Sequence, residues 1–558
     1  MKPLLILLIM LFQGGVVVTA EATAIRIVPD KGFYRPGETV NIQVSAPAGK
    51  LLDARITYLA DSVAEIFAVP IVDNTATIQW TPPLVTPRGY GVAVTIFDEA
   101  RQVVAEQSGA FDVLEHWTDA PRYGFFSDFT ADRDNYGATL DWMLRHHING
   151  VQFYDWQYRW EDLLPDTDLF EDGLGRPQSM TTVRRLIDLA RGANIAAMPY
   201  TAIYGVSAPY FHVHPDWGLF DANGEVNRLG EDLIAIFDPT PGSPWNTHLL
   251  AEFADVLDNT LFDGIHIDQY GSPKNGYDAA GNDVDLAEVF PQFVQQADAL
   301  VNEKRGSEGA VIFNLVGNWP VETVAPVNPD ATYIEVWHPH NDYADLQRII
   351  EKAQSLSRKP VILAAYIPPE NAINWRLANA VIFASGGYHL ETGEPGGMLQ
   401  HPYFPEFGQI PEAERETYGR YYDFLVRYEN VLSLASPTER DGVLTIEGVR
   451  TRGLRAIDRV MPVGRAGDDF ETFSLVNFRG IDFSTWNAPT TVPPQPFSDL
   501  ALSIEVSRPV KRVWMASPDS AATMEAAELP FSIQNGTLNV TIPQLNYWTM
   551  IVVEYDDL

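Results

Sequence analysis

The sequence predicts a multidomain protein in which a central (β/α)8 barrel lies between two β-rich domains. Three observations support this prediction. Residues 21–115 alternate apolar and polar side chains between turns, residues 116–437 alternate short apolar runs with helical patterns, and residues 438–558 return to alternation. At about 150 residues per domain, a chain of 558 residues is long enough for these three units.

The first 20 residues have the layout of a secretory signal peptide. Lys2 precedes the apolar run LLILLIMLF, and Val18 and Ala20 occupy the small-residue positions before a cleavage site. A membrane anchor is the alternative, but the continuous apolar run is shorter than the ~20 residues that span a bilayer. We therefore expect a secreted protein, extracellular or periplasmic, that has no membrane association after cleavage.

The first β-rich segment is expected to form a small β-sandwich. The run VNIQV at 40–44 alternates directly after the turn RPGE, and further turn signals follow at short intervals. In the last segment, the alternating run LNVTI at 538–542 follows Asn535 and Gly536, a pair that is typical of hairpin turns. Both ends of the chain are therefore predicted to be antiparallel β-structure.

The central region contains eight apolar runs that we predict to be the strands of the barrel. They are RYGFFSDF, INGVQFYDW, NIAAMPYTAIY, FDGIHIDQY, AVIFNLVG, TYIEVW, PVILAAYIP and AVIFASGGYHL. Helical patterns lie between them, for example Val183, Leu186, Ile187 and Ala190, which share one helix face. Strands that alternate with helices over this length are typical of a (β/α)8 barrel.

Composition narrows the class of function. The formal net charge of −36 without a basic stripe disfavours nucleic acid and anionic membranes as partners, and it fits a neutral substrate. The chain has no cysteine, so neither disulfides nor thiol nucleophiles are available. Tryptophan and tyrosine are concentrated in the middle of the chain, where such rings can stack on sugars or simply fill the core. We expect a monomer.

Two acidic residues stand where barrel enzymes place catalytic groups, at the C-terminal ends of strands. Asp268 ends one apolar strand, and Glu335 has the equivalent position two strands later. Two carboxylates that face each other there can cleave a glycosidic bond, one as nucleophile and the other as acid/base. Apolar neighbours favour a protonated Glu335, whereas His266 and Gln269 favour an ionised Asp268. The alternative is that each acid forms a structural ion pair.

Other residues at the predicted strand ends are candidates for substrate binding. They are Asp128, Tyr154, Asp155, Trp156, Tyr200, Tyr204, His266, Gln269, Asn314, Trp337, His389 and Glu391. Trp217 and Trp319 are further candidates for stacking on glucose units, with loop packing as the alternative. For Asp155 the alternative is a buried acid that accepts backbone hydrogen bonds, and for His266 it is a role in orienting Asp268.

No metal site is predicted, and the expected chemistry requires no cofactor. The histidine pairs lack the spacing of zinc motifs, and no thiol is present. The loop YDAAGNDVD at 277–285 is the one candidate for calcium, through Asp278, Asn282, Asp283 and Asp285. It departs from the EF-hand pattern.

These residues resemble glycoside hydrolase family 66, which contains dextranases and cycloisomaltooligosaccharide glucanotransferases. The resemblance rests on PRYGFFSDF, HHINGVQFYDW, MPYTAIYG, FDGIHIDQYG, YIEVW and GGYHLETGEPGGMLQHPYFP, and it covers nearly the whole chain after the signal peptide. It implies an immunoglobulin-like β-sandwich, a (β/α)8 barrel and a C-terminal antiparallel β-sandwich. It also implies retaining cleavage of α-1,6-linked glucan, such as dextran and isomaltooligosaccharides, with Asp268 as nucleophile and Glu335 as acid/base.

Within this family, hydrolysis and cyclising transfer are the alternatives. Cyclising members carry an inserted carbohydrate-binding module, whereas this chain continues from the last predicted strand through PYFPEFG into the helix EAERETYGRYYDFLVRYENVL. We therefore favour an endo-acting dextranase that releases isomaltooligosaccharides by double displacement, with the glucanotransferase as the alternative. A catalytically silent glucan-binding protein is a further alternative, although it would not need both acids. A barrel glycosidase for another linkage is the last.

Overall fold

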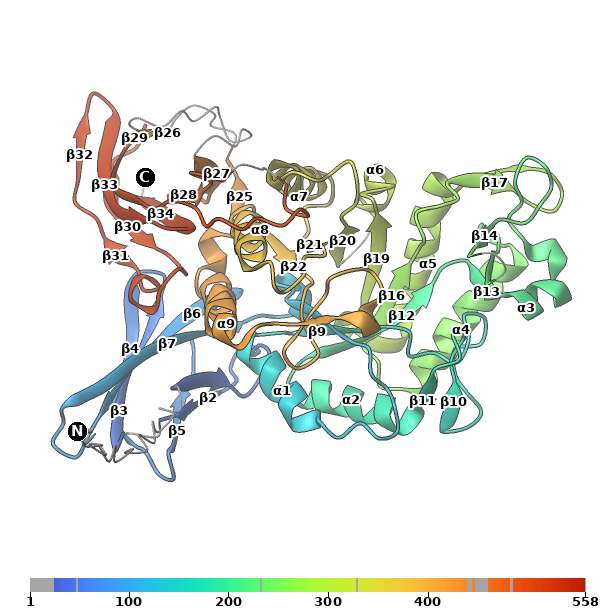
Figure 1. Cartoon of the computed structure of the whole chain (residues 1–558), viewed down its shortest axis with the longest axis horizontal. Helices are drawn as coiled ribbons and strands as arrows, with labels where there is room; N and C mark the ends of the chain where they lie inside the picture. Colours follow the sequence, from blue (N-terminus) through green and yellow to red (C-terminus); the bar gives the residue numbers. More distant parts are fainter. Residues whose placement is uncertain are drawn as a thin grey trace, which may run out of the picture.

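The structure is a computed structural model of the chain, and it describes residues 25–46, 49–230, 233–327, 330–438, 444–446, 460–481 and 485–556. The predicted signal peptide at 1–20 lies outside these residues. Within the described part, no helix combines the length and the apolar character needed to cross a membrane. Figure 1 shows two β-rich units at one end of an elongated molecule and a barrel with its helices in the remainder.

Two antiparallel sheets form the N-terminal unit, with strand orders β1-β2-β5 and β4-β3-β6-β7. The strands are β1 (Arg26–Pro29), β2 (Val40–Ser45), β3 (Leu51–Tyr58), β4 (Asp61–Pro70), β5 (Thr75–Trp80), β6 (Arg88–Phe97) and β7 (Val103–Val113). Val40, Ile42 and Val44 of β2 are buried in a core shared by both sheets, while the residues between them are more exposed. The apolar side chains of the alternating pattern therefore face the core of the sandwich. The unit is the expected immunoglobulin-like β-sandwich.

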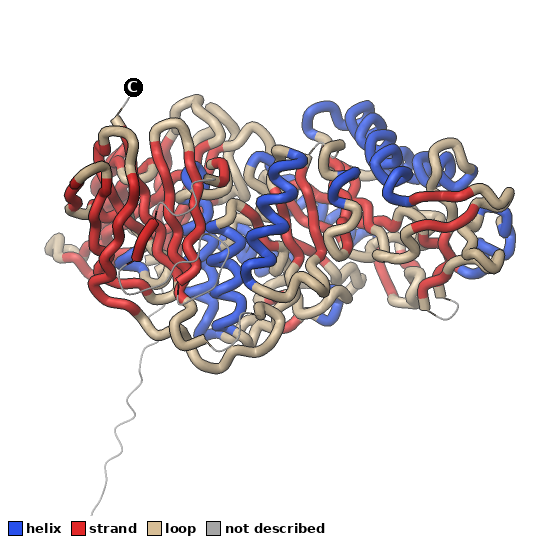
Figure 2. Tube along the Cα trace, turned by 90° about the horizontal axis from the view of Figure 1, so that it is seen from above, coloured by secondary structure: helices blue, strands red, loops and turns tan. Residues whose placement is uncertain are grey.

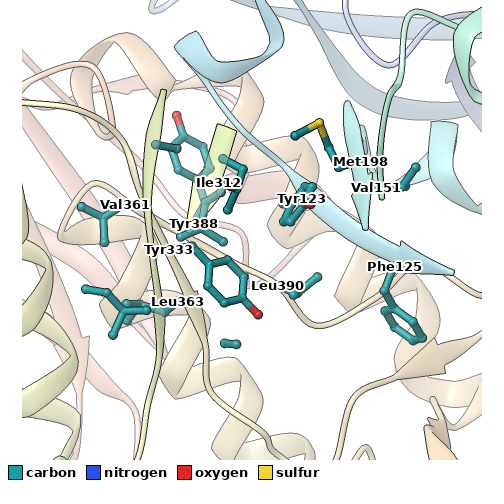
Figure 3. Packing of buried hydrophobic residues seen from close by; sticks show 14 of the residues in the cluster. Tyr123, Phe125, Val151, Met198, Ile312, Tyr333, Val361, Leu363, Tyr388 and Leu390 are labelled. Carbon is teal, nitrogen blue, oxygen red and sulfur yellow. The ribbon is translucent and has the colours of Figure 1, made fainter. Parts of the chain in front are cut away.

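The barrel is built on one sheet of eight parallel strands, in the order β22-β21-β20-β19-β16-β12-β9-β8 within the described residues. The strands are β8 (Tyr123–Phe126), β9 (Gly150–Phe153), β12 (Ala196–Ala202), β16 (Gly264–Asp268), β19 (Ala310–Val316), β20 (Ala331–Glu335), β21 (Val361–Ala364) and β22 (Gly387–His389). Figure 3 shows buried side chains of these strands, among them Tyr123, Met198 and Tyr333, gathered between the strands. The interior of the barrel is thus packed with side chains, as expected.

Helices follow the strands and cover the outside of the barrel. They are α1 (Tyr136–Arg145), α2 (Met180–Gly192), α4 (Pro244–Asn259), α5 (Leu286–Arg305), α6 (Val321–Val324), α7 (Tyr343–Ser357), α8 (Ala372–Ala384) and α9 (Glu412–Arg427). In α2 the predicted apolar face is buried, and the N-cap residue Ser179 accepts a hydrogen bond from the backbone N–H of Thr182. In α7, Leu346, Ile349, Ile350 and Ala353 have the same helical spacing and are buried in the same way.

The last predicted strand is shorter than expected. The residues AVIF at 380–383 belong to helix α8, and β22 begins only at Gly387. Helix α8 packs against α7, α9, β22 and the C-terminal strand β28 (Phe470–Asn477), so its apolar residues are buried on all sides. When every residue of a helix is buried, its apolar residues do not recur every three to four positions, so the sequence pattern cannot distinguish it from a buried strand. Gly386, with a φ of 75°, follows the end of the helix.

Small hairpins and sheets extend the loops that follow the barrel strands. They are β10 (Leu169–Glu171) with β11 (Pro177–Ser179), β13 (Gly205–Ser207) with β14 (Arg228–Leu229) and β15 (Ile234–Ile236), β17 (Asn275–Tyr277) with β18 (Asp283–Asp285), and β23 (Gly397–Met398) with β24 (Gly408–Gln409). Helix α3 (Ala208–Val213) follows β13. Because these segments come after the C-terminal ends of the strands, they surround the rim where barrel active sites lie.

The C-terminal unit is an antiparallel β-sandwich with the strand orders β25-β27-β28-β34-β30-β31 and β26-β29-β33-β32. Its strands are β25 (Ser436–Pro437), β26 (Leu444–Ile446), β27 (Val460–Ala466), β28 (Phe470–Asn477), β29 (Phe497–Glu505), β30 (Val510–Ala516), β31 (Ala527–Glu528), β32 (Phe531–Gln534), β33 (Thr537–Leu545) and β34 (Trp548–Tyr555). Asn535 and Gly536 both have positive φ and join β32 to β33, which confirms the predicted hairpin.

Helix α9 holds the three units together. Arg427 at its end is buried and donates a hydrogen bond of 2.9 Å to the hydroxyl of Thr57 in the N-terminal sandwich. On the C-terminal side, the ring of Phe424 lies 4.7 Å from that of Trp548. In Figure 1 this helix, drawn in orange, lies between the blue and the red β-units, and Figure 2 shows helices next to the strand-rich end of the molecule.

Candidate active site

A cavity of about 770 Å³ opens at the C-terminal ends of the barrel strands and contains both predicted catalytic acids. A larger cavity of about 1140 Å³ lies between the end of α7 and residues 433–438, and neither acid contributes to its wall. Because titratable groups converge on the first cavity, we assign the active site to it despite its smaller volume.

Eight of the residues predicted from strand ends line this cavity together. They are Tyr154, Asp155, Tyr200, Asp268, Gln269, Asn314, Glu335 and Trp337. They come from β9, β12, β16, β19 and β20, or from the residues directly after these strands. The rule that side chains at the C-terminal ends of barrel strands converge therefore locates most of the cavity wall.

Asn314 connects the two acids. Its Nδ2 lies 2.7 Å from Oδ1 of Asp268 and 2.9 Å from Oε2 of Glu335. Strand β19, which carries Asn314, lies between β16 and β20 in the sheet, so the amide reaches both neighbours. The two distances together allow at most 5.6 Å between these carboxylate oxygens. Both acids are buried, with exposed fractions of 8 % and 7 %, and neither forms a salt bridge with a described Lys or Arg.

Further donors surround each carboxylate. The hydroxyl of Tyr200 donates a short hydrogen bond to Oδ2 of Asp268. The hydroxyl of Tyr366 donates to Oε1 of Glu335 at 3.1 Å, and the side chain of Trp337 also hydrogen-bonds this carboxylate. Each acid therefore has donors on both oxygens, which can hold either carboxylate in place while it is ionised.

Burial raises the pKa of both acids. The pKa of Asp268 is raised to about 7, first by burial and then by the charge of Glu335, against the donors Tyr200 and Asn314. The pKa of Glu335 is also raised by burial. Two carboxylates this close share one proton near neutral pH.

Three predicted aromatic residues, Trp156, Tyr204 and His266, do not line the cavity. The Trp156 indole donates to the backbone oxygen of Tyr200 at 3.2 Å, and the hydroxyl of Tyr204 accepts a hydrogen bond from the backbone N–H of Tyr270 at 2.8 Å. The His266 ring stacks on those of Tyr123 and Tyr200. His266 shares the inward face of β16 with Asp268, but two residues lower. The sequence predicts which face of the strand His266 occupies, but it does not predict how deep in the barrel the side chain lies.

Three predicted polar residues also lie away from the cavity wall. Asp128 accepts hydrogen bonds from the backbone N–H and the hydroxyl of Thr130, at 3.1 and 2.7 Å, within its own turn. His389 and Glu391 both bind the Asn379 side chain, at 2.7 and 2.8 Å. That amide comes from α8, so these two residues connect the end of β22 to the helical layer outside the barrel.

The remaining candidates have local partners. Trp217 stacks on His214 with ring centroids 4.1 Å apart, and Trp319 packs against Phe290 at 5.8 Å; neither lines the cavity. In the loop at 277–285, Asp278 accepts hydrogen bonds from Ala280 and Asn282 of its own turn. Among the described residues, no cluster of three or more His, Cys, Asp or Glu side chains is arranged to hold a metal ion.

The cavity also contains residues that the sequence analysis missed. Those with side chains suited to sugar binding are Gln152, Trp160, Tyr270, Lys274, Tyr333, His338, Tyr366, Tyr403 and Phe404. Tyr366 lies two residues after the end of β21, so the same strand-end rule applied to AAYIP would have found it. Tyr403 and Phe404 come from the long loop after β22, and nothing in their local sequence indicates that this loop folds over the barrel mouth.

With this geometry in hand, comparison with known proteins identifies the family. The family model described as Glycosyl hydrolase family 66 matches residues 29–552. The chain belongs to this family. The match confirms the resemblance seen in the sequence, and the chain is therefore an enzyme that acts on glycosidic bonds, as a hydrolase or a transglycosylase.

Individual relatives agree with this assignment. Two proteins of Niallia circulans, each named cycloisomaltooligosaccharide glucanotransferase, are 24 % identical to the chain and cover 95 % of it, with 71 % and 72 % of their own lengths aligned. The first alignment spans 702 residues, which exceeds the 558 of this chain, so at least 144 aligned positions of that relative have no counterpart here.

Solved structures share the fold. A Paenibacillus sp. cycloisomaltooligosaccharide glucanotransferase complexed with cycloisomaltoheptaose has a TM-score of 0.87 and 21 % identity, and covers 94 % of this chain and 99 % of its own. The α-L-fucosidase isoenzyme 2 of Paenibacillus thiaminolyticus has a TM-score of 0.52 and 11 % identity, over 78 % of this chain and 100 % of its own. The first likeness confirms the fold class over almost the whole chain.

Proposed function

We propose that this protein cleaves α-1,6-glucosidic bonds of dextran-type glucan by retaining double displacement. The observation that carries the proposal is the single amide of Asn314 between the two acids, which allows at most 5.6 Å between the bound oxygens of Asp268 and Glu335. Retaining glycosidases hold their carboxyl groups about 5–5.5 Å apart, whereas inverting enzymes need about 6.5–9.5 Å to admit a water molecule. The narrow spacing supports retention.

In the first step, Oδ2 or Oδ1 of Asp268 attacks the anomeric carbon while Glu335 gives its proton to the departing glycosidic oxygen. The products are a glucosyl ester on Asp268 and a free sugar hydroxyl. In the second step, Glu335 takes a proton from the incoming hydroxyl, which displaces Asp268 with a second inversion. Donation from Tyr200 and Asn314 favours the ionised form of Asp268 that the attack requires. Glu335 then carries the proton that the pair shares, as the first step requires.

The substrate class follows from the relatives and the cavity. The relatives are named for cyclic isomaltooligosaccharides, and one solved relative is complexed with cycloisomaltoheptaose. The cavity itself is lined by aromatic rings and amides, with Lys274 as the one Lys or Arg among its described lining residues. Such a surface suits a neutral glucan, whose sugar faces stack on rings and whose hydroxyls bind amides and carboxylates.

Two acceptors are candidates for the second step, and different observations favour them. Both Niallia circulans relatives are glucanotransferases, which favours transfer to a hydroxyl of the same glucan chain and cyclic products. At least 144 aligned positions of the first relative have no counterpart in this chain, and the lack of a carbohydrate-binding module among them would favour water as acceptor. The comparisons support transfer more directly than the hydrolysis expected from the sequence.

The decisive experiment is product analysis on dextran, with starch and cellulose as controls. We expect cleavage of dextran alone, with the first-formed reducing ends in the α configuration by NMR. Cyclic products would establish transfer, and linear isomaltooligosaccharides would establish hydrolysis. Asp268→Asn and Glu335→Gln should abolish activity, whereas Asp128→Asn, outside the cavity, should retain it. Activity in either of the first two variants, or β-configured products, would refute the mechanism.

We also propose that the protein is secreted and monomeric and that it needs no cofactor. The signal-peptide pattern supports export, and the proposed chemistry uses only Asp268 and Glu335. Secretion predicts a mature N-terminus near residue 21 in the culture medium. Light scattering should give the mass of one chain, and chelation should leave the activity unchanged. Loss of activity with EDTA that is restored by calcium would point to the loop at 277–285.

A further inference from the structure

One arginine outside the cavity connects two of its walls. Arg176 lies where the hairpin of β10 and β11 turns back, and the hairpin itself fixes its position. Asp172, at the other side of the turn, accepts hydrogen bonds from the backbone N–H of Arg176 at 2.8 Å and from its Nε at 2.6 Å. Only 21 % of the Arg176 side chain is exposed, and Asp172 is buried. The guanidinium is therefore held in one orientation.

The two Nη atoms of this guanidinium reach residues that do line the cavity. Nη2 lies 3.1 Å from Oδ2 of Asp155, and Nη1 lies 3.3 Å from the hydroxyl of Tyr403. Asp155 follows β9 and Tyr403 belongs to the loop after β22, so the two are 248 positions apart in sequence, and Arg176 binds both of them. Arg176 itself is not part of the cavity wall.

Asp155 has the properties of a functional residue. Its φ of 53° is in the left-handed region, which costs a non-glycine residue energy unless its surroundings impose it. Burial raises its pKa to about 6, Arg176 is the main influence that lowers it, and Asp172 raises it. The tyrosines that face this carboxylate are Tyr154, Tyr200 and Tyr270. Without Arg176, Asp155 would be buried with no cation beside it among the described residues.

We propose that Arg176 is a positioning residue that keeps Asp155 as a carboxylate acceptor and Tyr403 opposite it, so that the two walls bind hydroxyls of one glucosyl unit. The inference rests on the proposed function, because it assigns part of the binding site for the same glucan. Arg176 acts through its neighbours and does not touch the sugar. Its loss should therefore affect substrate binding more than the chemical step.

The test compares three variants of the full-length protein. Arg176→Met removes the positive charge and the N–H donors of the guanidinium. We expect kcat/KM on isomaltooligosaccharides to fall by about tenfold or more, mainly through a higher KM, as for the loss of a hydrogen bond to a charged group. The acid limb of the kcat/KM profile should move to higher pH, since Asp155 then needs a higher pH to ionise. Arg176→Lys restores the charge and should recover the pH profile.

Arg159→Met is the matched control. Arg159 stacks on Tyr158 at 4.0 Å and donates to the backbone oxygen of Glu171 in β10 at 2.6 Å, so it supports the same hairpin without reaching the cavity. We expect KM and the pH profile of this variant to match the wild type. Two results would refute the proposal and leave Arg176 with a structural role. One is an equal loss of kcat/KM in both methionine variants. The other is a lower melting temperature of Arg176→Met with unchanged KM and pH profile.

A second readout separates this proposal from the proposed function. The guanidinium also binds Asp172 and Tyr403, but its ion pair with Asp155 requires the ionised form of Asp155. The difference in melting temperature between wild type and Arg176→Met should therefore be smallest near pH 4 and grow as the pH rises through 6, the pKa of Asp155. This difference needs no substrate. If wild-type protein neither cleaves nor binds isomaltooligosaccharides, the proposed function fails. A melting difference that is constant with pH would contradict the Asp155 pairing alone.

Discussion

Substitution of Tyr200 by phenylalanine removes one hydroxyl and tests how Asp268, the proposed nucleophile, is held. This hydroxyl donates to Oδ2 of Asp268 inside a buried site. A hydrogen bond to a charged group contributes about 1.5–3 kcal/mol. At about 1.36 kcal/mol per pKa unit, its loss should raise the pKa of Asp268 by about 1–2 units. If the same energy is lost from the transition state, kcat/KM falls by about 10- to 150-fold.

Initial rates on dextran across the pH range provide the assay, together with thermal unfolding of each variant. Tyr388→Phe is a suitable control, because this buried tyrosine of β22 donates to the Ser433 hydroxyl at 2.7 Å, far from the cavity wall. It should leave kcat/KM and its pH dependence unchanged. A Tyr200→Phe enzyme with wild-type kcat/KM and an unshifted profile would show that the hydroxyl does not control the ionisation of Asp268.

Three further outcomes follow from buried charges. The wild-type kcat/KM should fall above about pH 7, because the raised pKa of Asp268 marks where the catalytic pair loses its shared proton; a flat profile to pH 9 would contradict this. Arg122→Met leaves Asp112, 2.6 Å from the guanidinium, buried without its cation, and should cost about 3–5 kcal/mol in urea unfolding. Because burial raises the pKa of Asp112, that deficit should shrink as the pH falls and the acid becomes neutral. Glu394→Gln weakens the buried ion pair with Arg133 at 2.7 Å and should lower the melting temperature, and an unchanged value would show that this pair does not stabilise the fold.

The barrel and most of its site were predictable because both depend on local patterns. Apolar runs locate the strands, and the residue that ends each run is placed at the rim by the parallel order of the strands. This rule placed Asp268, Asn314 and Glu335 together before any coordinates. It failed where depth matters, as for His266, which shares the inward face of β16 but lies one layer below Asp268.

Other parts of the site depend on contacts that no local pattern encodes. Tyr403 reaches the cavity because a long loop after β22 folds back over the barrel mouth, and Arg176 reaches Tyr403 from a hairpin after β9. Helix α8 was partly mistaken for a strand because its apolar residues are buried on every side. In these cases tertiary packing determines the local structure and the contacts, and neither residue propensity nor apolar periodicity predicts that packing.

The position of α9 limits how the chain can be shortened. One side of this helix rests on the N-terminal sandwich, where Arg427 meets Thr57, and the other on the C-terminal sandwich, where Phe424 meets Trp548. Deleting either flanking unit would leave a guanidinium or an aromatic surface without cover, so the catalytic portion should aggregate when produced alone. Protein engineers who want a smaller catalyst would do better to shorten the hairpin of β17 and β18, because none of its described residues lines the cavity.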